Sequence, residues 1–261
     1  MNNIKLKSAE EIVFMRESGS LLANVFSELD KFIAAGMSTL EINDFVDHYI
    51  VNTLQARPAS KGQYGYKYVL NSSINEVVCH GVPSPAKKLK QGDIVNIDIT
   101  LEKNGYIADS SKMYAIGPIS PIAKRLVDVT YQAMWQGIAI VKPGATTGDI
   151  GHAIQRYAEK HGYSIVRDYC GHGIGQEMHE DPQILHFGKA ATGIKLEAGM
   201  TFTIEPMINQ GTHKTKVKKD GWTVVTRDNK LSAQWEHTIL VTPSGYEVLT
   251  LRSEESLPAA V

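Results

Sequence analysis

Apolar positions near the start of the chain follow the period of an α-helix. Between residues 9 and 34 they recur at steps of three and four, which predicts an amphipathic helix. Ser8 and Glu11 form a capping box at its start, because each side chain can bind the backbone N–H of the other residue. Ser38 and Glu41 form the same box before a second apolar stripe. We therefore predict two helices in succession.

The period then changes to that of β-strands. Residues 56–68 fit neither period and are expected to form a loop, and residues 71–80 are expected to form a strand. Residues 91–112 predict a β-hairpin, because a run rich in β-branched residues closes on Asn104-Gly105, a dipeptide favoured in type I′ turns. The turn also sets the expected register of the two strands.

The second half of the chain repeats this order. A third helix is predicted from Pro121, a residue tolerated at the first helical position, to Pro143-Gly144. A fourth is predicted over about residues 147–161. Short apolar runs then predict strands at 163–169, 183–187, 200–208, 222–226 and 235–241. We expect the tail from Arg252 onward to be loosely held.

Two sets of residues recur in the two halves at nearly the same offset. Gly36, Ser38, Thr39, Glu41 and Ile42 match Gly144, Thr146, Thr147, Asp149 and Ile150, and Leu89, Gly92, Ile97 and Asp98 match Leu196, Gly199, Ile204 and Glu205. Their common order predicts two related halves, at about 1–118 and 119–252, facing each other across a pseudo-two-fold axis. Glu205 then occupies in the second half the place that Asp98 holds in the first.

Composition places the protein in a general class. The 261 residues are 43% hydrophobic and 21% charged with a formal net charge of −1, which gives no case for a protein that wraps nucleic acid or binds membrane surfaces through its charge. No apolar run approaches the roughly 20 residues that span a bilayer. The N-terminus turns acidic where a secretion signal would be apolar, and Cys79 and Cys170 make no disulfide framework. We expect a cytosolic protein.

Acidic residues within apolar strands carry the strongest chemical signal. In the hairpin register, Thr100 faces Asp109, and Asp98 lies diagonally from Asp109 on the same face, with backbones about 7–8 Å apart. Glu205 and Glu236 also sit within apolar runs. Two carboxylates at contact repel by about 4 kcal/mol in a surface-like dielectric, whereas a cation between them reverses the sign. Two divalent ions would balance four such charges.

Simpler interpretations exist for most of these residues taken alone. Asp98 and Glu236 could face solvent on an antiparallel sheet, and His80 and His179, which lie near turns, could be structural. His172 differs, because three nearby glycines let other backbone segments approach closely, which a packed histidine would not need. His172 is therefore the imidazole expected beside the carboxylates.

Ordered motifs along the chain closely resemble those of type I methionine aminopeptidase. They cover about residues 7–252 and include Ser73-Ile-Asn-Glu-Val-Val-Cys-His-Gly81, Gly92-Asp-Ile-Val-Asn-Ile-Asp98, Asp109-Ser-Ser-Lys-Met113, Cys170-Gly-His-Gly-Ile-Gly175, Gly199-Met-Thr-Phe-Thr-Ile-Glu-Pro206, Lys219-Asp-Gly-Trp222 and Leu231-Ser-Ala-Gln-Trp-Glu-His-Thr238. The resemblance implies an α+β protein with the pita-bread fold, in which two pseudo-symmetric halves share a central antiparallel sheet with helices on its outer side. It also implies a single catalytic domain over residues 1–261.

The same resemblance implies the ligands of two divalent metal ions. These are Asp98, Asp109, His172, Glu205 and Glu236, with Asp109 and Glu236 bridging the ions. Four carboxylates and one imidazole make a hard, oxygen-rich site, which favours Mn, Fe or Co over a thiolate type of Zn site. The sequence leaves all four metals open.

The implied activity is removal of the N-terminal methionine from nascent proteins and peptides when the second residue is small. Glu205 is expected to take the proton of the attacking water, His179 to hydrogen-bond the carbonyl oxygen as negative charge develops, and His80 to hold the backbone just beyond the scissile bond. The expected partners are nascent polypeptide N-termini, and also the ribosome if the basic run Lys214–Lys219 is more than a solvated loop. We expect a cytoplasmic monomer without DNA or membrane partners.

The side-chain pocket departs from the resemblance. Its implied substrate-binding residues are His80 and His179 together with Tyr66, Trp222, Ser60, Gln63, Asn71 and Met178. The last four stand where the family commonly has cysteine, tyrosine, cysteine and phenylalanine. A thioether gains from apolar and aromatic contacts, so one alcohol and two amides weaken that gain. We hypothesise that the pocket accepts a more polar first residue or binds methionine less tightly.

Three alternatives stay open. One is a paralogous pita-bread aminopeptidase with an altered side-chain preference. Another is a non-catalytic peptide-binding relative, which would be expected to lose one or more metal ligands, whereas all five are present. The third is a hydrolase that acts before proline or a creatinase-like enzyme, which would be expected to carry an N-terminal domain ahead of the first helix.

Overall fold

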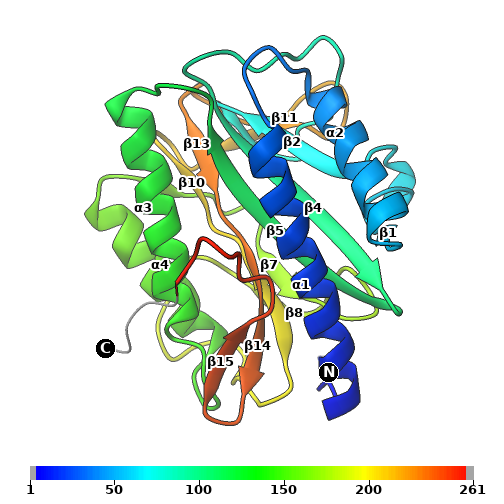
Figure 1. Cartoon of the computed structure of the whole chain (residues 1–261). Helices are drawn as coiled ribbons and strands as arrows, with labels where there is room; N and C mark the ends of the chain where they lie inside the picture. The colour runs from blue at the N-terminus through cyan, green and yellow to red at the C-terminus, as the bar shows by residue number, and fades with distance from the viewer. Residues whose placement is uncertain (1–3, 257–261) are drawn as a thin grey trace.

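Helices lie on one side of a layer of antiparallel strands in the computed structural model, which describes residues 4–256 (Figure 1). The α-helices are α1 (Ala9–Phe32), α2 (Thr39–His48), α3 (Pro121–Ile138) and α4 (Thr147–Lys160), close to the predicted ranges. A π-helical turn, Tyr49–Thr53, extends α2, and a short 3-10 turn spans Gln63–Gly65. Within residues 4–256, no helix is long and apolar enough to cross a membrane.

The predicted hairpin forms the centre of the first sheet. Its strands are β4 (Ile94–Lys103) and β5 (Tyr106–Ala115), and β1 (Arg57–Pro58) and β2 (Leu70–Ile74) pair with the other edge of β4. Asp98 pairs with Ser111 and Thr100 with Asp109, so the predicted register is confirmed. The turn residues have the positive φ that a type I′ turn requires, +54° at Asn104 and +82° at Gly105.

The second half contributes a five-stranded antiparallel sheet. Its order is β15 (Gly245–Val248), β14 (His237–Thr242), β9 (Thr201–Ile204), β7 (Gly171–Gly173) and β8 (Glu180–Ile184). Two smaller sheets run in the orders β13 (Ser232–Gln234), β10 (Met207–Asn209), β6 (Ser164–Ile165) and β11 (Thr215–Val217), β12 (Val224–Thr226), β3 (Val77–Cys79). An isolated antiparallel bridge between Ser111 and Glu236 joins β5 to the second half.

Two predicted strands are divided in the structure, and a third begins later than predicted. The run 71–80 forms β2 and β3, because Asn75 between them has a φ of +54°. The run 200–208 forms β9 and β10, with Glu205 and Pro206 between them, and proline cannot donate to a ladder. Trp235 and Glu236 fall between β13 and β14. Glu205 and Glu236 therefore stand in breaks between strands, not inside strands as predicted.

Alternation along β4 separates an apolar side from a polar side. The buried residues Val95, Ile97, Ile99 and Leu101 join one cluster with side chains of α1 and α2, including Leu22, Phe26, Ile42 and Val46. Complete burial of each such side chain stabilises the fold by about 1.5–3 kcal/mol. The intervening residues Asn96, Asp98 and Thr100 point to the opposite face. The helices thus cover one face of the strands, and the polar face is left for a site.

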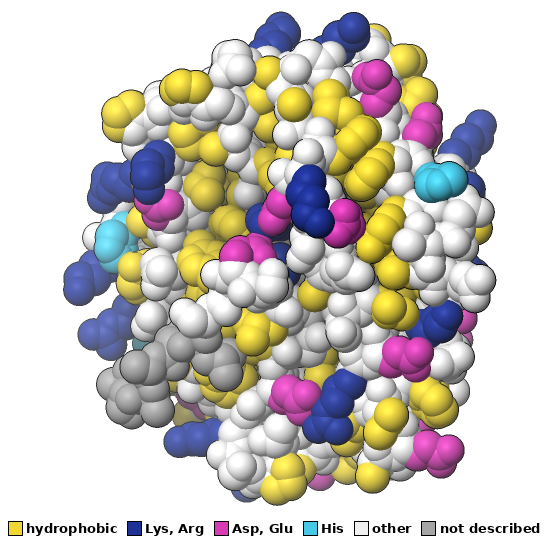
Figure 2. All heavy atoms as spheres, in the orientation of Figure 1, with side chains coloured by type: hydrophobic (Ala, Val, Ile, Leu, Met, Phe, Trp, Pro, Cys, Tyr) yellow, Lys and Arg dark blue, Asp and Glu magenta, His cyan; other side chains and the backbone are white. Residues whose placement is uncertain are grey.

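The outer surface of the helices carries both signs of charge. Figure 2 shows Lys and Arg side chains interspersed with Asp and Glu over this face, with apolar side chains between them. Among the described residues in this view, neither sign forms one large patch. This distribution agrees with the near-neutral net charge of −1.

The same hydrogen bonds recur at the start of α2 and of α4. The N–H of Gly36 donates to the carbonyl of Leu89 at 2.8 Å, and the N–H of Gly144 donates to that of Leu196 at 2.9 Å. The two glycines have φ values of +92° and +91°. The capping boxes predicted at α1 and α2 are present, and Thr146 and Asp149 form another at the start of α4. In each half, the segment just before the helix is therefore hydrogen-bonded to the segment just before a strand, β4 in the first half and β9 in the second.

The C-terminal segment contradicts the expectation of a loosely held tail. After β15 the chain passes between α1 and α3 (Figure 1), and Arg252 is 1% exposed. Its guanidinium donates to the Glu255 carboxylate at 2.8 Å. The prediction was wrong because this burial depends on residues distant in sequence, which local composition does not reveal. Residues 257–261, also part of the predicted tail, lie outside the described residues.

Glu255 predicts a pH-dependent contribution to stability. Burial alone would raise the pKa of its carboxyl group, but His237 and Arg252 hold that pKa well below its usual range. A depressed folded-state pKa stabilises the protein above the unfolded-state pKa of about 4.3, and this contribution is lost as the pH falls. We expect Glu255→Gln to lower the free energy of unfolding by about 3 kcal/mol at pH 7, because Arg252 loses its buried partner.

Urea unfolding of wild type and Glu255→Gln at pH 7 and at pH 4 checks this prediction. The difference in the free energy of unfolding between the two proteins should be smaller at pH 4. The control is Glu254→Gln. Glu254 is 43% exposed, pairs with Lys112 at 2.5 Å and lies at the longer distance of 3.8 Å from Arg252 Nε, so its replacement should cost less than about 1 kcal/mol. Equal losses for the two variants at pH 7 would contradict the prediction.

Candidate metal centre and substrate cavity

A cavity of about 750 Å³ opens on the polar side of the strands. Asp98 and Thr100, which point away from the helices, form part of its wall. Every site residue predicted from the sequence lines this cavity: Ser60, Gln63, Tyr66, Asn71, His80, Asp98, Asp109, His172, Met178, His179, Glu205, Trp222 and Glu236. Segments from both halves of the chain therefore meet at one place.

The five predicted ligands converge within this cavity. One ligand atom from each of Asp109, His172 and Glu236 lies within 4.8 Å of the others. His172 Nε2 is 3.8 Å from Asp109 Oδ2 and 3.6 Å from Glu205 Oε1. The carboxyl groups of Asp98 and Asp109 are close enough for each to shift the pKa of the other. The side chains come from β4, β5, β7 and the two breaks between strands, so nonlocal packing assembles them.

Burial changes the protonation preferences of all five groups. It raises the pKa of Asp98 to about 6 and that of Glu205 to about 8. It raises the pKa values of Asp109 and Glu236 well above the usual range, and neighbouring carboxylates raise them further. Burial lowers the pKa of His172 to about 4, so its imidazole is neutral at pH 7 and offers a lone pair. Without a cation these carboxyl groups therefore resist ionisation, and a nearby cation would favour their charged forms.

The donor set fits divalent metal ions. Asp109 Oδ1 is buried and has no hydrogen-bond partner among the described residues, although buried polar atoms are almost always paired. Four carboxylates and one neutral imidazole are ligands that Mn, Fe and Co accept readily. A cation among them would both pair the orphaned oxygen and offset the mutual repulsion of the carboxylates.

Glycines around His172 allow β7 to pack against its neighbours. A Cβ on Gly171 would clash with the carbonyl oxygen of Thr203, and one on Gly173 would clash with that of Asp181. The Nδ1 of His172 lies 3.0 Å from the carbonyl oxygen of Gly173, which leaves Nε2 to face the carboxylates. The predicted close approach of backbone at these glycines is confirmed.

Several residues that support Glu205 were missed from the sequence. Thr203 Oγ1 donates to its Oε1 at 2.8 Å, and Gln234 Nε2 donates to its Oε2 at 3.3 Å. The backbone N–H of Glu205 donates to His186 Nε2 at 3.1 Å. Thr203 could have been found, because it lies two residues before Glu205 and strand alternation puts both on one face. His186 carried no comparable signal.

The predicted substrate residues lie around the ligand cluster. The rings of His172 and His179 are 4.4 Å apart between centroids, and Gln63 Nε2 lies 3.5 Å from His179 Nδ1. The His80 ring stands edge-on to Tyr169 at 5.6 Å, and its backbone has a φ of +55°. The two histidines thus border the metal ligands.

The side-chain pocket combines aromatic and polar walls. Tyr66 and Trp222 contact each other with ring centroids 5.1 Å apart. Asn71 Nδ2 donates to Asp98 Oδ2 at 3.4 Å, so this amide touches a predicted metal ligand directly. Ser60 Oγ lies 2.5 Å from Thr100 Oγ1, and Thr100 was not among the predicted residues. The other lining residues missed from the sequence include Tyr169, Cys170 and Met207.

Neutralising one carboxylate should stabilise the metal-free protein. The folded-state pKa of Asp98, about 6, lies above the unfolded value of about 3.9, so its ionisation costs stability at pH 8. We expect metal-free Asp98→Asn to gain about 1–3 kcal/mol at pH 8, which raises Tm by several degrees. Mn²⁺ should raise the Tm of wild type but raise that of the variant much less.

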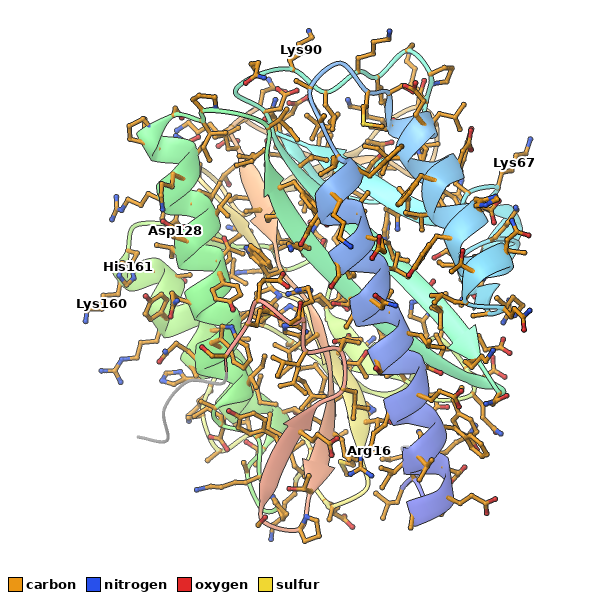
Figure 3. The ribbon with its side chains drawn as sticks, in the orientation of Figure 1. Arg16, Lys67, Lys90, Asp128, Lys160 and His161 are labelled. Carbon is orange, nitrogen blue, oxygen red and sulfur yellow. The ribbon has the colours of Figure 1, made fainter. Side chains whose placement is uncertain are left out.

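Thermal denaturation of chelated and Mn²⁺-loaded protein checks this prediction. The control is Asp128→Asn, since Asp128 lies on α3 (Figure 3), is exposed and pairs only with Lys124 among the described residues. Its Tm should change little in either state. A metal-free Asp98→Asn protein that melts below wild type at pH 8 would show that burial of this charge is not what limits stability.

Comparison with known proteins extends over nearly the whole chain. The model of metallopeptidase family M24 matches residues 13–243. The chain is 48% identical over 258 residues to methionine aminopeptidase from Salmonella typhimurium, which covers 99% of this chain and 98% of that protein. It is 47% identical over 258 residues, with the same coverage, to methionine aminopeptidase from Escherichia coli K12.

Solved structures agree with the sequence comparison. Methionine aminopeptidase from Rickettsia prowazekii superposes with a TM-score of 0.93 at 48% identity, covering 95% of this chain and 100% of that one. The enzyme from Thermotoga maritima gives a TM-score of 0.92 at 41% identity, with 95% and 99% covered. Prolidase from Pyrococcus furiosus, at 22% identity and a TM-score of 0.76, shares the fold alone. The fold is thus the pita-bread fold, and the chain belongs to metallopeptidase family M24 and, within it, to the methionine aminopeptidases.

Proposed function

We propose that the chain is a metal-dependent aminopeptidase that removes the N-terminal methionine from nascent proteins and peptides whose second residue is small. The convergence of five ligand side chains in one cavity carries this proposal. It is supported by relatives that share 48% of residues along almost their entire length. A binder that had lost catalysis would not need this complete set.

Two divalent ions are part of the proposal. Asp98, Asp109, His172, Glu205 and Glu236 would hold them, with Asp109 and Glu236 shared between the two. When bound, the ions would supply Lewis acidity, which lowers the pKa of a water molecule and polarises a carbonyl group. The hard donor set favours Mn, Fe or Co, and Zn remains an option for the same ligands.

The side chains around the ligands have distinct roles in the proposed hydrolysis. Glu205 takes the proton of the attacking water, and donors from Thr203 and Gln234 fix the orientation of its two oxygens. The amide nitrogen of Gln63 faces Nδ1 of His179 at 3.5 Å, and a hydrogen bond from this amide to Nδ1 would put the imidazole proton on Nε2. His179 can then donate to the carbonyl oxygen as negative charge develops. His80 holds the peptide backbone just beyond the scissile bond.

The cellular setting and domain organisation also belong to the proposal. We place the protein in the cytoplasm as a monomer with one catalytic domain over residues 1–261, divided into halves at about 118. The matched hydrogen bonds at Gly36 and Gly144 support this division. The basic run Lys214–Lys219 includes β11, which pairs with β12, and β12 pairs with β3, the strand that ends one residue before His80. That position suits contact with ribosomal RNA while a nascent chain enters.

Chelation and Glu205→Gln test the proposed chemistry. EDTA treatment should abolish release of methionine from Met-Ala-Ser, and Mn²⁺ or Co²⁺ should restore it. Glu205→Gln should lower kcat by about 10²–10⁴-fold with metal present, because the proton acceptor is lost. The matched control Glu197→Gln changes an exposed glutamate outside the cavity and should keep wild-type activity. Full turnover after complete chelation would contradict the proposal.

A panel of Xaa-Ala dipeptides tests the side-chain pocket. Because Asn71 and Ser60 present polar groups, we expect Asn71→Cys to raise the ratio of kcat/KM for Met-Ala over Gln-Ala by about tenfold, the scale of one changed pocket contact. Met178→Leu exchanges one apolar side chain for another and should leave the ratio near its starting value. Wild-type protein that already prefers methionine by several orders of magnitude would remove the hypothesis of a more polar preference.

A further inference from the structure

Arg252 is a buried cation on the helical side of the strands. Its side chain is fully enclosed, and the guanidinium carbon lies 5.5 Å from the ring centroids of both Phe26 in α1 and Trp235. A buried charge of this kind is costly unless it is paired and hydrogen-bonded. The partners of Arg252 therefore indicate what it does.

These partners belong to the strands that carry two predicted metal ligands. The Nη1 of Arg252 donates to Ser110 Oγ at 3.1 Å and to the Ser111 carbonyl at 3.4 Å. The Nη2 donates to Glu255 Oε1 at 2.8 Å and lies 3.2 Å from His237 Nε2. The Glu255 carboxylate balances the charge, while the other contacts reach β5 and the start of β14.

Ser110 links Arg252 to the backbone of Glu236. Its hydroxyl donates to the Glu236 carbonyl at 2.7 Å, and the Glu236 N–H donates to the Ser111 carbonyl at 3.2 Å. Ser110 directly follows Asp109, and strand alternation points their side chains to opposite faces. Arg252 thus contacts the back of the bridge whose front presents Asp109 and Glu236 to the cavity.

We propose that Arg252 is a positioning residue for Asp109 and Glu236, and that it sets the affinity of the cavity for divalent metal. The proposal rests on the metal ligands of the proposed function. Asp109 Oδ1 has no partner within the described residues, so the place of this carboxylate depends on its backbone. The guanidinium holds that backbone against Glu236 through Ser110 and Ser111. Loss of such an outer partner typically weakens metal binding by about 10–100-fold.

The test measures metal binding directly, without reference to turnover. Metal-free wild type, Arg252→Lys and Ser110→Ala are titrated with Mn²⁺, and free Mn²⁺ is followed by electron paramagnetic resonance. Lysine keeps the charge but cannot donate toward both β5 and Glu255 in a fixed fork. We expect Arg252→Lys to raise the Mn²⁺ dissociation constant by about 10–100-fold. At saturating Mn²⁺, kcat should recover to within a few-fold of wild type.

Arg16→Lys is the matched control. Arg16 lies at the side of α1 (Figure 3) and makes a two-point ion pair with Glu247 on β15, on the exposed surface and outside the cavity lining. The same substitution there should leave Mn²⁺ affinity unchanged. Ser110→Ala removes only the hydroxyl between Arg252 and Glu236, so it should weaken Mn²⁺ binding several-fold while the fold is retained.

Each possible result either supports or overturns the positioning role of Arg252. Weaker Mn²⁺ binding by folded Arg252→Lys, with kcat recovered at saturation and Arg16→Lys unaffected, supports the positioning role. A lower Tm with unchanged Mn²⁺ affinity overturns it, because Arg252 would then serve the fold alone. If Arg252→Lys does not fold, the Ser110→Ala variant provides the test. An unchanged Mn²⁺ affinity in that variant overturns the proposal. Wild type that binds no Mn²⁺ would instead overturn the proposed function, and the positioning role with it.

Discussion

The grouping of four carboxylates, three of them buried, is the constraint on which the rest of the structure depends. Asp98, Asp109, Glu205 and Glu236 crowd one imidazole, and burial raises the pKa of every one of these acids. No local segment of chain would adopt this arrangement alone, because each carboxylate raises the cost of the next. The hairpin, the second sheet and the bridge between them hold the acids together, and a cation gives this arrangement a chemical use.

The position of the helices allows such a site to exist. Because α1–α4 cover one face of the strands, the apolar core and the polar cavity share the same strands but not the same side. Along β4, successive side chains alternate between the apolar core under the helices and the polar side on which the cavity lies. The fold therefore does not have to place the predicted metal ligands within its hydrophobic core.

Sequence reasoning succeeded where local rules decide the structure and failed where distant contacts do. Asn104-Gly105 predicted the register that puts Asp98 and Asp109 on one face, because a two-residue turn leaves little choice. Capping pairs gave the helix starts for the same reason. Arg252 looked like part of a loose tail, and His186 showed no sign of its contact with Glu205, because their partners lie far along the chain. The breaks at Glu205 and Glu236 were missed because an apolar run conceals a change of pairing partner.

Because of these breaks, the backbone that carries the two glutamates differs from the backbone that carries the two aspartates. The aspartates stand on a hairpin whose strands pair continuously, and their short side chains leave them little freedom. The glutamates stand where pairing is interrupted, and each has one more rotatable bond. The aspartate side of the cavity therefore rests on continuous strand pairing, while the glutamate side rests on individual hydrogen bonds such as those from Thr203 and Gln234 to Glu205. The two sides of the cavity thus owe their shape to different interactions.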